Sequence, residues 1–304
     1  MTGYDVIGDV HGHAGKLEGL LRQLGYVERD GAWRHSGRQA IFVGDLIDRG
    51  PEQRRTVDTV RSMIDAGSAQ MVLGNHEFNA IAWMTRNPDN SDEHLRRRSD
   101  ENRVQHAAFL SEVGEESALH NEYVDWFRTL PIWLDLGDLR IVHACWSSDE
   151  ISVVGQTLTE ELVVRGSRRG SPEYHAIDVL LKGPEIDLRG RTYRDKDGTV
   201  RKRARLRWWD ATATTLRSAA EIPGEVKACD DFPPLPDDHV EEAVVYAYRD
   251  SVPVIFGHYW RTKHRVVDSR KTACVDFSAG RGGPLVAYRW DGGDLTTENF
   301  VAFP

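Results

Sequence analysis

The sequence predicts a protein of the α/β class, in which strands alternate along the chain with helices. Short apolar runs of strand length are separated by segments that repeat Leu, Val, Met and Ile at helical intervals. The early runs are almost continuously apolar, which is typical of interior strands covered on both faces. A carboxylate, amide or imidazole side chain follows five of these runs, so we expect the strands to end at a functional site.

The alternating pattern defines the expected elements in chain order. Helices are predicted at 16–24 and 52–66. Strands are predicted at seven positions: 4–9, 40–45, 70–73, 139–143, 253–257, 273–277 and 285–290.

Two segments lack the alternation. Residues 79–130 are rich in helix formers and charge, which predicts a helical insertion with a surface loop. Residues 147–250 contain Pro, Gly and charge clusters and are expected to form a β-rich cap with a hairpin. Neither has enough apolar pattern for a core of its own, so we expect a single domain over 1–304 with both insertions beside the site.

The composition limits the partners and the compartment. The 304-residue chain has a net charge of −9 and a pI near 5.8, which argues against general binding to nucleic acid or to anionic membranes. Its three cysteines, Cys145, Cys229 and Cys274, lack metal-type spacing and suit a reducing compartment as inert thiols. No apolar run approaches the roughly 18 residues of a membrane span and no signal-peptide pattern is present, so we expect a soluble, cytoplasmic protein.

The side chains that follow the strands form a set suited to metal ions. Carboxylate, imidazole and amide oxygen together favour Mn, Fe, Zn or a similar divalent ion, whereas calcium prefers oxygen alone and structural zinc prefers thiolates. Six such groups are too many for one open four-coordinate site but suffice for two ions that share a carboxylate, an arrangement that promotes displacement at phosphorus. The candidate ligands are Asp9, His11, Asp45, Asn75, His143 and His258.

The motifs carrying these residues resemble a known family. "GDVHG", "GDLIDRG" and "GNHE", followed by single histidines in "VHA" and "GH", are similar to the calcineurin-like metallophosphoesterases and specifically to the phosphoprotein phosphatase branch. The resemblance runs from residue 4 to about residue 290 and is weak through 147–250. It implies a sandwich of two mixed sheets flanked by helices. "GHYW", with Trp260 where many members have a second histidine, favours the same branch.

The resemblance also implies a role for each matching residue. Asp9, His11 and Asp45 would bind the first metal ion. Asp45 would bridge to a second ion, whose ligand set is completed by Asn75, His143 and His258. His76 would donate a proton to the leaving oxygen, Asp48 would orient that imidazole, and Arg49, with Asn75, would hold the phosphate. Arg207 is the candidate for a second phosphate-binding arginine. The expected cofactor is a pair of divalent ions, Mn first, with Fe, Zn, Ni and Co as alternatives.

The alternating arginines and Glu77 each have a functional and a structural interpretation. Arg201, Arg203, Arg205 and Arg207 alternate beside a hairpin signal, so a strand would place them on one face, either to attract an anionic substrate or, as we favour, as a charged edge. Glu77 could support a ligand or start a helix, and the helix start is favoured. The remaining histidines are expected to be structural or solvated: His13, His35, His94, His106, His120, His175, His239 and His264.

The predicted function is metal-dependent hydrolysis of phosphomonoesters on phosphorylated proteins or small molecules, in the manner of a serine/threonine protein phosphatase or a broad-specificity phosphatase. A dinucleoside polyphosphate hydrolase is the first alternative, with diadenosine tetraphosphate as substrate. In the symmetric bacterial hydrolases of that kind, the second motif resembles "ARG" and the third resembles "GNHD". This chain has "DRG" and "GNHE" at the same places, which favours the phosphatase. A non-catalytic binding module is the second alternative, although none of the expected ligands is missing.

Overall fold

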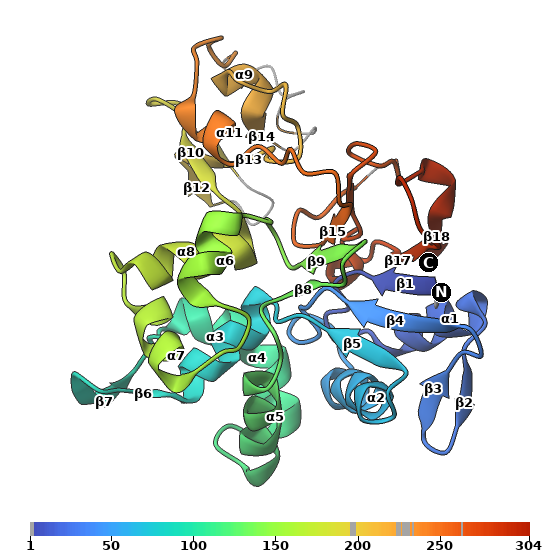
Figure 1. Ribbon diagram of the computed structural model, residues 1–304. Helices are drawn as coiled ribbons and strands as arrows, with labels where there is room; N and C mark the ends of the chain where they lie inside the picture. Colours follow the sequence, from blue (N-terminus) through green and yellow to red (C-terminus); the bar gives the residue numbers. More distant parts are fainter. Residues whose placement is uncertain (1–2, 195–198, 223–225, 227–231, 233, 263) are drawn as a thin grey trace. The chain divides into compact units, whose positions relative to one another are not determined.

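The computed structural model in Figure 1 describes residues 3–194, 199–222, 226, 232, 234–262 and 264–304. The chain forms two compact units. The first contains residues up to 182 together with 252–304, and the second contains 183–251. The expectation of a single domain over the whole chain stays a prediction.

A five-stranded mixed sheet forms one layer of the first unit. Its order is β18-β17-β1-β4-β5, with β1, β4 and β5 parallel and β17 and β18 antiparallel to their neighbours. In the register of this sheet, Val6 of β1 lies opposite Ile41 on one side and Tyr288 on the other. The strands are β1 (Gly3–Ile7), β4 (Arg38–Phe42), β5 (Ala69–Met71), β17 (Leu285–Trp290) and β18 (Phe300–Phe303).

A four-stranded mixed sheet forms the second layer. Its order is β16-β15-β9-β8, with β9, β15 and β16 parallel and β8 antiparallel to β9. The strands are β8 (Trp133–Asp135), β9 (Arg140–Val142), β15 (Val254–Phe256) and β16 (Thr272–Cys274). All seven strands expected from the sequence are therefore present, each within a few residues of its predicted position.

The two sheets share one hydrophobic core. Val6 and Ile41 of the first sheet belong to the same buried cluster as Ile141, Ile255 and Ala273 of the second. Fully burying an aliphatic side chain of this size contributes about 1.5–3 kcal/mol, so this shared layer is a main source of stability. The predicted sandwich of two mixed sheets is confirmed.

Helices link and flank the strands (Figure 1). α1 (Ala14–Leu24) packs against β17 and β18, and α2 (Gln53–Asp65) packs against β5. α1 ends because Gly25 adopts the left-handed conformation, with φ of 93°, that closes helices. A short hairpin of β2 (Val27–Arg29) and β3 (Ala32–Arg34) lies between α1 and β4.

The insertion after β5 is mainly helical, as predicted. α3 (Asn75–Met84) is followed by α4 (Asp100–Val113) and α5 (Ala118–Arg128), and both α3 and α4 contact α5. Between α3 and α4 the chain forms a hairpin of β6 (Arg86–Asn87) and β7 (Asn90–His94), where only a loop was expected. Its strands are polar and exposed, so they carry none of the apolar alternation that predicts a strand.

The second insertion begins with helices rather than strands. α6 (Ser148–Val154), α7 (Glu160–Ser167) and α8 (Pro172–Lys182) belong to the first unit. The Thr159 side chain caps α7 by accepting the backbone N–H of Leu162. The first unit also contains the short 3₁₀ helices η1 (Ala279–Arg281) and η2 (Thr297–Asn299).

The second unit contains the expected hairpin. Tyr193 of β11 pairs with Arg201 of β12, while the "DG" turn between them lies outside the described residues. A separate three-stranded sheet has the order β10-β13-β14. The elements are β10 (Glu185–Asp187), β11 (Tyr193–Arg194), β12 (Val200–Arg201), β13 (Arg203–Leu206), α9 (Leu216–Ala219), β14 (Ala220–Glu221) and α11 (Glu241–Val245).

The four alternating arginines do not share one strand. Arg201 ends β12, Arg203 and Arg205 lie in β13, and Arg207 follows it. Within β13 the buried residues Ala204 and Leu206 alternate with the arginines, so the basic side chains occupy the less buried face of that strand.

The cysteines that the structure describes are buried. Cys145 and Cys274 are buried free thiols, and Cys229 lies outside the described residues. Across the part of the chain that the structure describes, no helix is long and apolar enough to cross a membrane.

Candidate active site

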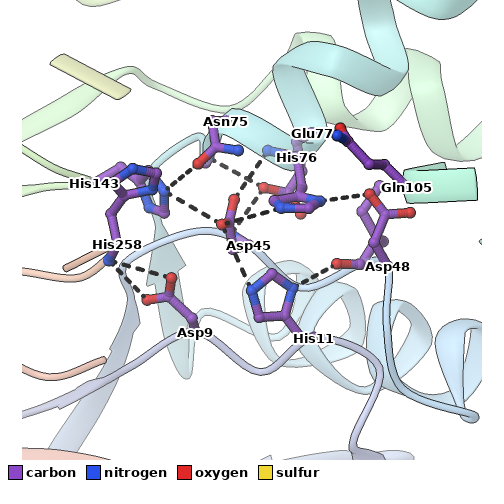
Figure 2. Close-up of polar contacts among 12 residues, drawn as sticks. Asp9, His11, Asp45, Asp48, Asn75, His76, Glu77, Gln105, His143 and His258 are labelled. Carbon is purple, nitrogen blue, oxygen red and sulfur yellow. Dashed lines mark hydrogen bonds and ion pairs between the residues drawn. The ribbon is translucent and has the colours of Figure 1, made fainter. Parts of the chain in front are cut away.

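Polar side chains from the ends of both sheets meet in one cluster, shown in Figure 2. Asp9 and His11 follow β1, and Asp45 follows β4. Asn75 begins α3, separated from the end of β5 by three residues. His143 and His258 follow β9 and β15 of the second sheet. The sandwich therefore brings together, from five strand ends, all six residues predicted as metal ligands.

The backbone bends sharply where these side chains enter the cluster. His11, Asp45 and His258 all have positive φ, at 49°, 53° and 64°. Residues other than glycine are uncommon in this region and tend to occur at functional sites. The strained turns stop each strand and direct its side chain into the cluster.

Asp45 lies at the centre of the cluster. Its Oδ2 is 3.5 Å from Nε2 of His143 and 3.8 Å from Nε2 of both His11 and His76. Potential ligand atoms of Asp45, His143 and His258 lie within 4.8 Å of one another, and so do those of Asp45, His11 and His76. The two groups share Asp45, which is the geometry expected of a carboxylate between two cations.

Hydrogen bonds to carbonyl groups fix how two histidines face the cluster. Nδ1 of His11 lies 2.9 Å from the carbonyl oxygen of Ile47, and Nδ1 of His143 lies 2.7 Å from that of Val43. Each Nδ1 therefore carries a proton that it donates, which leaves Nε2 directed toward Asp45 as a potential ligand.

One contact tests whether the donor set fits a cation. Nε2 of His143 is 3.1 Å from the amide oxygen of Asn75. With Nδ1 donating to Val43, both facing atoms are acceptors, which repel each other unless a proton or a cation lies between them. Mixed nitrogen and oxygen ligands of this kind fit a divalent transition metal.

The pKa shifts of the clustered side chains also agree with a site for divalent cations. Burial, followed by the neighbouring carboxylate of Asp276, raises the pKa of Asp9 well above its usual range. Burial lowers the pKa of His11 to about 3. Burial opposes protonation of His143, but the charge of Asp45 raises its pKa to about 10. Buried carboxylates close together are costly without a compensating positive charge.

A second arrangement lies beside the cluster and contains Asp48 and His76. Nδ1 of His76 is 2.5 Å from Oδ2 of Asp48, and its Nε2 faces Asp45. Burial alone would raise the pKa of Asp48, but hydrogen bonds from His106 and His76 hold it below its usual range. Burial opposes the charge on His76, whereas Asp45 and Asp48 raise its pKa.

The turn carrying Asp48 and Arg49 is held by a buried glutamine. Asp48 and Arg49 have φ of 70° and 73°. Oε1 of Gln53 accepts the backbone N–H of Asp48 at 2.7 Å, and its Nε2 donates to the carbonyl oxygen of Gly50 at 2.6 Å. These bonds stabilise the unusual backbone of the turn and so position Arg49 next to the cluster.

Glu77 does more than start a helix. It accepts the backbone N–H of Gly74 at 3.1 Å, as in a capping box, so the expected helix start is present. The same carboxylate also accepts the N–H groups of Asp45 and Leu46. Burial, with the charge of Asp45, raises the pKa of Glu77 to about 7. Both functions considered for this residue are therefore combined.

Two features of the site are not predicted by the sequence pattern. His106, expected to be structural or solvated, has its Nδ1 2.7 Å from Oδ1 of Asp48. It begins the buried face of α4 that continues at Phe109, Leu110 and Val113, so a histidine at an apolar position was the available signal. The second feature is Gly280, which packs against Arg49. A Cβ at this position would lie 2.8 Å from Cδ of Arg49.

Arg207 is the one predicted site residue that belongs to the second unit. Its Nε lies 3.4 Å from Oε2 of Glu221, within the same unit. Its role in phosphate binding stays a prediction.

The fold and the cluster define a class of protein. Two mixed sheets whose strand ends deliver carboxylate, imidazole and amide ligands are characteristic of metal-dependent phosphoesterases, which hydrolyse phosphoester bonds. The chain belongs to the calcineurin-like phosphoesterase family, whose family model matches residues 4–259. The family uses a dinuclear metal site, and the candidate ligands for such a site are present here.

Curated relatives carry the names of nucleotide hydrolases. The asymmetrical bis(5'-nucleosyl)-tetraphosphatase PrpE of Bacillus subtilis is 29% identical over 158 residues, which is 49% of this chain and 59% of the relative. The PrpE of Anoxybacillus flavithermus is 46% identical over 74 residues, 24% of this chain and 30% of the relative. A symmetrical bis(5'-nucleosyl)-tetraphosphatase of Janthinobacterium is 32% identical over 196 residues, 62% of this chain and 58% of the relative. The chain thus spans little more than half the length of these B. subtilis and Janthinobacterium relatives.

A solved structure shares the fold over almost the whole chain. The protein serine/threonine phosphatase from Saccharomyces cerevisiae, described as similar to human phosphatase PP5, matches with a TM-score of 0.50. The match covers 99% of this chain and 78% of the yeast chain at 14% identity. At this identity the likeness concerns the fold alone.

Proposed function

We propose that the chain hydrolyses phosphomonoesters at a site that holds two divalent metal ions around Asp45. Asp9 and His11 would hold one ion, Asn75, His143 and His258 would hold the other, and Asp45 would contact both. When bound, such a pair of ions activates water and stabilises charge on the attacking and leaving oxygens. Manganese is the proposed metal, with iron, zinc, nickel and cobalt as alternatives.

The contact between Asp48 and His76 carries the proposal. The 2.5 Å contact orients the imidazole so that its Nε2 faces the same space as Asp45. A histidine held in this way can give a proton to the oxygen that leaves phosphorus. Arg49 and Asn75 would bind the phosphate, because a guanidinium offers phosphoryl oxygens two parallel hydrogen bonds.

The proton donor favours a phosphomonoester as substrate. An alkoxide, such as the one that leaves from phosphoserine or phosphothreonine, is a strong base and needs a proton as the bond to phosphorus breaks. A nucleoside phosphate is a much weaker base and gains less from an acid. A site built around an imidazole and its carboxylate partner therefore suits alcohol leaving groups.

A dinucleoside tetraphosphate is the second candidate substrate, because the curated relatives bear that activity in their names. The same metal pair and Arg49 would serve cleavage of a phosphoanhydride bond. Asymmetrical cleavage of diadenosine tetraphosphate would give ATP and AMP, whereas symmetrical cleavage would give two molecules of ADP. The products therefore distinguish the two named activities.

The test compares substrates on one preparation. Protein stripped of metal and reloaded with manganese is assayed with a phosphoserine peptide and with diadenosine tetraphosphate, and the nucleotide products are separated. His76→Asn and Asp48→Asn are measured beside His239→Asn, a control at an exposed histidine of the second unit.

We expect faster turnover of the phosphopeptide and a loss of roughly 10²-fold or more in the first two variants, in line with general acid catalysis. Faster turnover of the dinucleotide would instead support the second candidate. Absence of turnover together with absence of bound metal would support a non-catalytic binding module.

A further inference from the structure

Both oxygens of the Asp48 carboxylate are engaged by histidines. Oδ2 lies 2.5 Å from Nδ1 of His76, and Oδ1 lies 2.7 Å from Nδ1 of His106. Asp48 and His106 are 2% and 3% exposed, so water does not compete for these contacts. Three separate segments meet at this carboxylate: the turn after β4, the first turn of α3, and the middle of α4.

His106 donates to Asp48 from a pocket lined by aromatic rings. Its Nδ1 faces a carboxylate and therefore carries a proton. Its Nε2 is buried and has no hydrogen-bond partner among the described residues. The ring is 5.7 Å from that of Trp83, 5.1 Å from Phe109 and 6.4 Å from His120, measured between centroids.

His106 contributes a directed hydrogen bond from Nδ1 to Oδ1 of Asp48. With Oδ1 occupied, Asp48 offers Oδ2 to His76 in one orientation. That orientation in turn fixes which nitrogen of His76 carries the proton and where its Nε2 points, in the way that outer residues orient a catalytic or metal-binding histidine.

We propose that His106 is a positioning residue for the proton donor, acting through Asp48. The inference rests on the proposed function, because it assumes that His76 donates a proton to the leaving group. It also gives α4 of the helical insertion a part in the site, because α4 carries His106. The expected consequence is specific: loss of His106 weakens proton donation while binding of metal and of phosphate remains.

A matched pair of variants separates the hydrogen bond from packing. His106→Leu and His106→Asn give side chains of the same branching at a position surrounded by aromatic rings. Only the asparagine can place an N–H near the position of Nδ1 and donate to Asp48. A purely structural role would be served as well by leucine as by asparagine, and melting temperatures report whether either variant is less well folded.

The kinetic test uses two small monoesters with different leaving groups. An alkyl phosphate needs the acid, whereas an aryl phosphate with an acidic phenol needs it much less. We expect His106→Leu to lower kcat for the alkyl phosphate by about 10- to 100-fold, part of the roughly 10²- to 10⁴-fold that a general acid supplies. The aryl phosphate should change much less, KM should stay constant, and His106→Asn should recover most of the lost rate.

The inference is overturned if His106→Leu turns over the alkyl phosphate like the wild type, or if it slows both esters equally. A second readout needs no turnover: the downfield proton resonance of the Nδ1–H of His76, which should persist in His106→Asn and shift in His106→Leu. An unchanged resonance in His106→Leu also overturns the inference. If the wild type is inactive but the His76 resonance shifts in His106→Leu as expected, the result counts against the proposed function and not against the positioning role of His106.

Discussion

The carboxylate of Glu77 holds the backbone of Asp45. Oε2 of Glu77 accepts the N–H of Asp45 at 2.9 Å, and Oε1 accepts the N–H of Leu46 at 2.8 Å. Asp45 has a φ of 53° and stands between the two groups of candidate ligands. Glu77 is completely buried, so its hydrogen bonds to the turn are not replaced by water. A residue that starts α3 thus also fixes the residue proposed to contact both metal ions.

Replacing Glu77 by Gln should weaken both the fold and the metal site. The amide would have to point its own N–H toward a backbone N–H, which leaves a buried donor unsatisfied at a cost of about 1–3 kcal/mol. We expect a lower free energy of unfolding in urea and less manganese retained after dialysis, measured by elemental analysis. Glu93→Gln, on the exposed hairpin strand β7, is the control. Equal metal retention in both variants would contradict the prediction.

Replacing Arg49 by Lys should impair substrate binding without removing metal. Lysine keeps the charge but cannot form two parallel hydrogen bonds with a phosphoryl group. Loss of one charge-assisted hydrogen bond costs about 1.5–3 kcal/mol, so kcat/KM should fall by roughly 10- to 100-fold. Steady-state kinetics and metal analysis check this, with Arg270→Lys, at a side chain that is 86% exposed, as the control. Unchanged kinetics would remove Arg49 from the proposed phosphate site.

Replacing Gly280 by Ala should displace two residues of the site. A Cβ there would lie 2.8 Å from Cδ of Arg49 and from Cδ2 of His11, closer than such atoms pack. Overpacking of this kind costs about 1–3 kcal/mol of stability. The clash is relieved only if Arg49 or His11 moves, so we expect kcat/KM to fall. Gly37→Ala is the matched control because its Cβ would meet nothing within 4 Å. Similar activity of the two variants would show that the loop around Gly280 yields without moving Arg49.

Stability should decrease on mild acidification because of His120. Burial lowers the pKa of this imidazole to about 4, and its Nδ1 accepts the N–H of Glu116 at 3.1 Å. In the unfolded chain the pKa is about 6.5. Between pH 6.5 and 4 the unfolded chain binds a proton that the folded chain does not, so the free energy of unfolding falls as the pH falls.

His120→Asn tests this explanation. The amide oxygen can accept the same N–H but does not titrate, so the variant should lose less stability than the wild type between pH 7 and pH 5. Urea unfolding at the two pH values measures the difference. Identical losses would assign the acid sensitivity to other groups.

The sequence predicted the elements that have strong local patterns. β1, β4 and β17 were found because their apolar runs are long, and the residues around Asp45 were found because the ends of parallel strands meet at one edge. β6 and β7 were missed because their strands are short, polar and exposed. The helices from 148 to 182 were missed because the Pro, Gly and charge clusters of the surrounding segment outweighed shorter apolar repeats.

Long-range contacts of single side chains could not be predicted. The bond between Asp48 and His106 joins residues 58 positions apart, and neither local propensity nor periodicity specifies such a partner. The approach of Gly280 to Arg49 depends on how the loop after β16 folds back over the turn after β4. Both contacts follow from tertiary packing, which a single sequence does not display.

The pairing of β1 with β17 has a consequence for synthesis on the ribosome. β1 can pair with β4 early, but its other edge waits for Leu285–Trp290, the last strand but one in the chain. Until then the nascent chain carries an unpaired apolar strand edge, which is a template for aggregation. We expect chains stalled before residue 285 to depend on chaperones, and chains released after β17 to be far less dependent, in a cell-free translation assay.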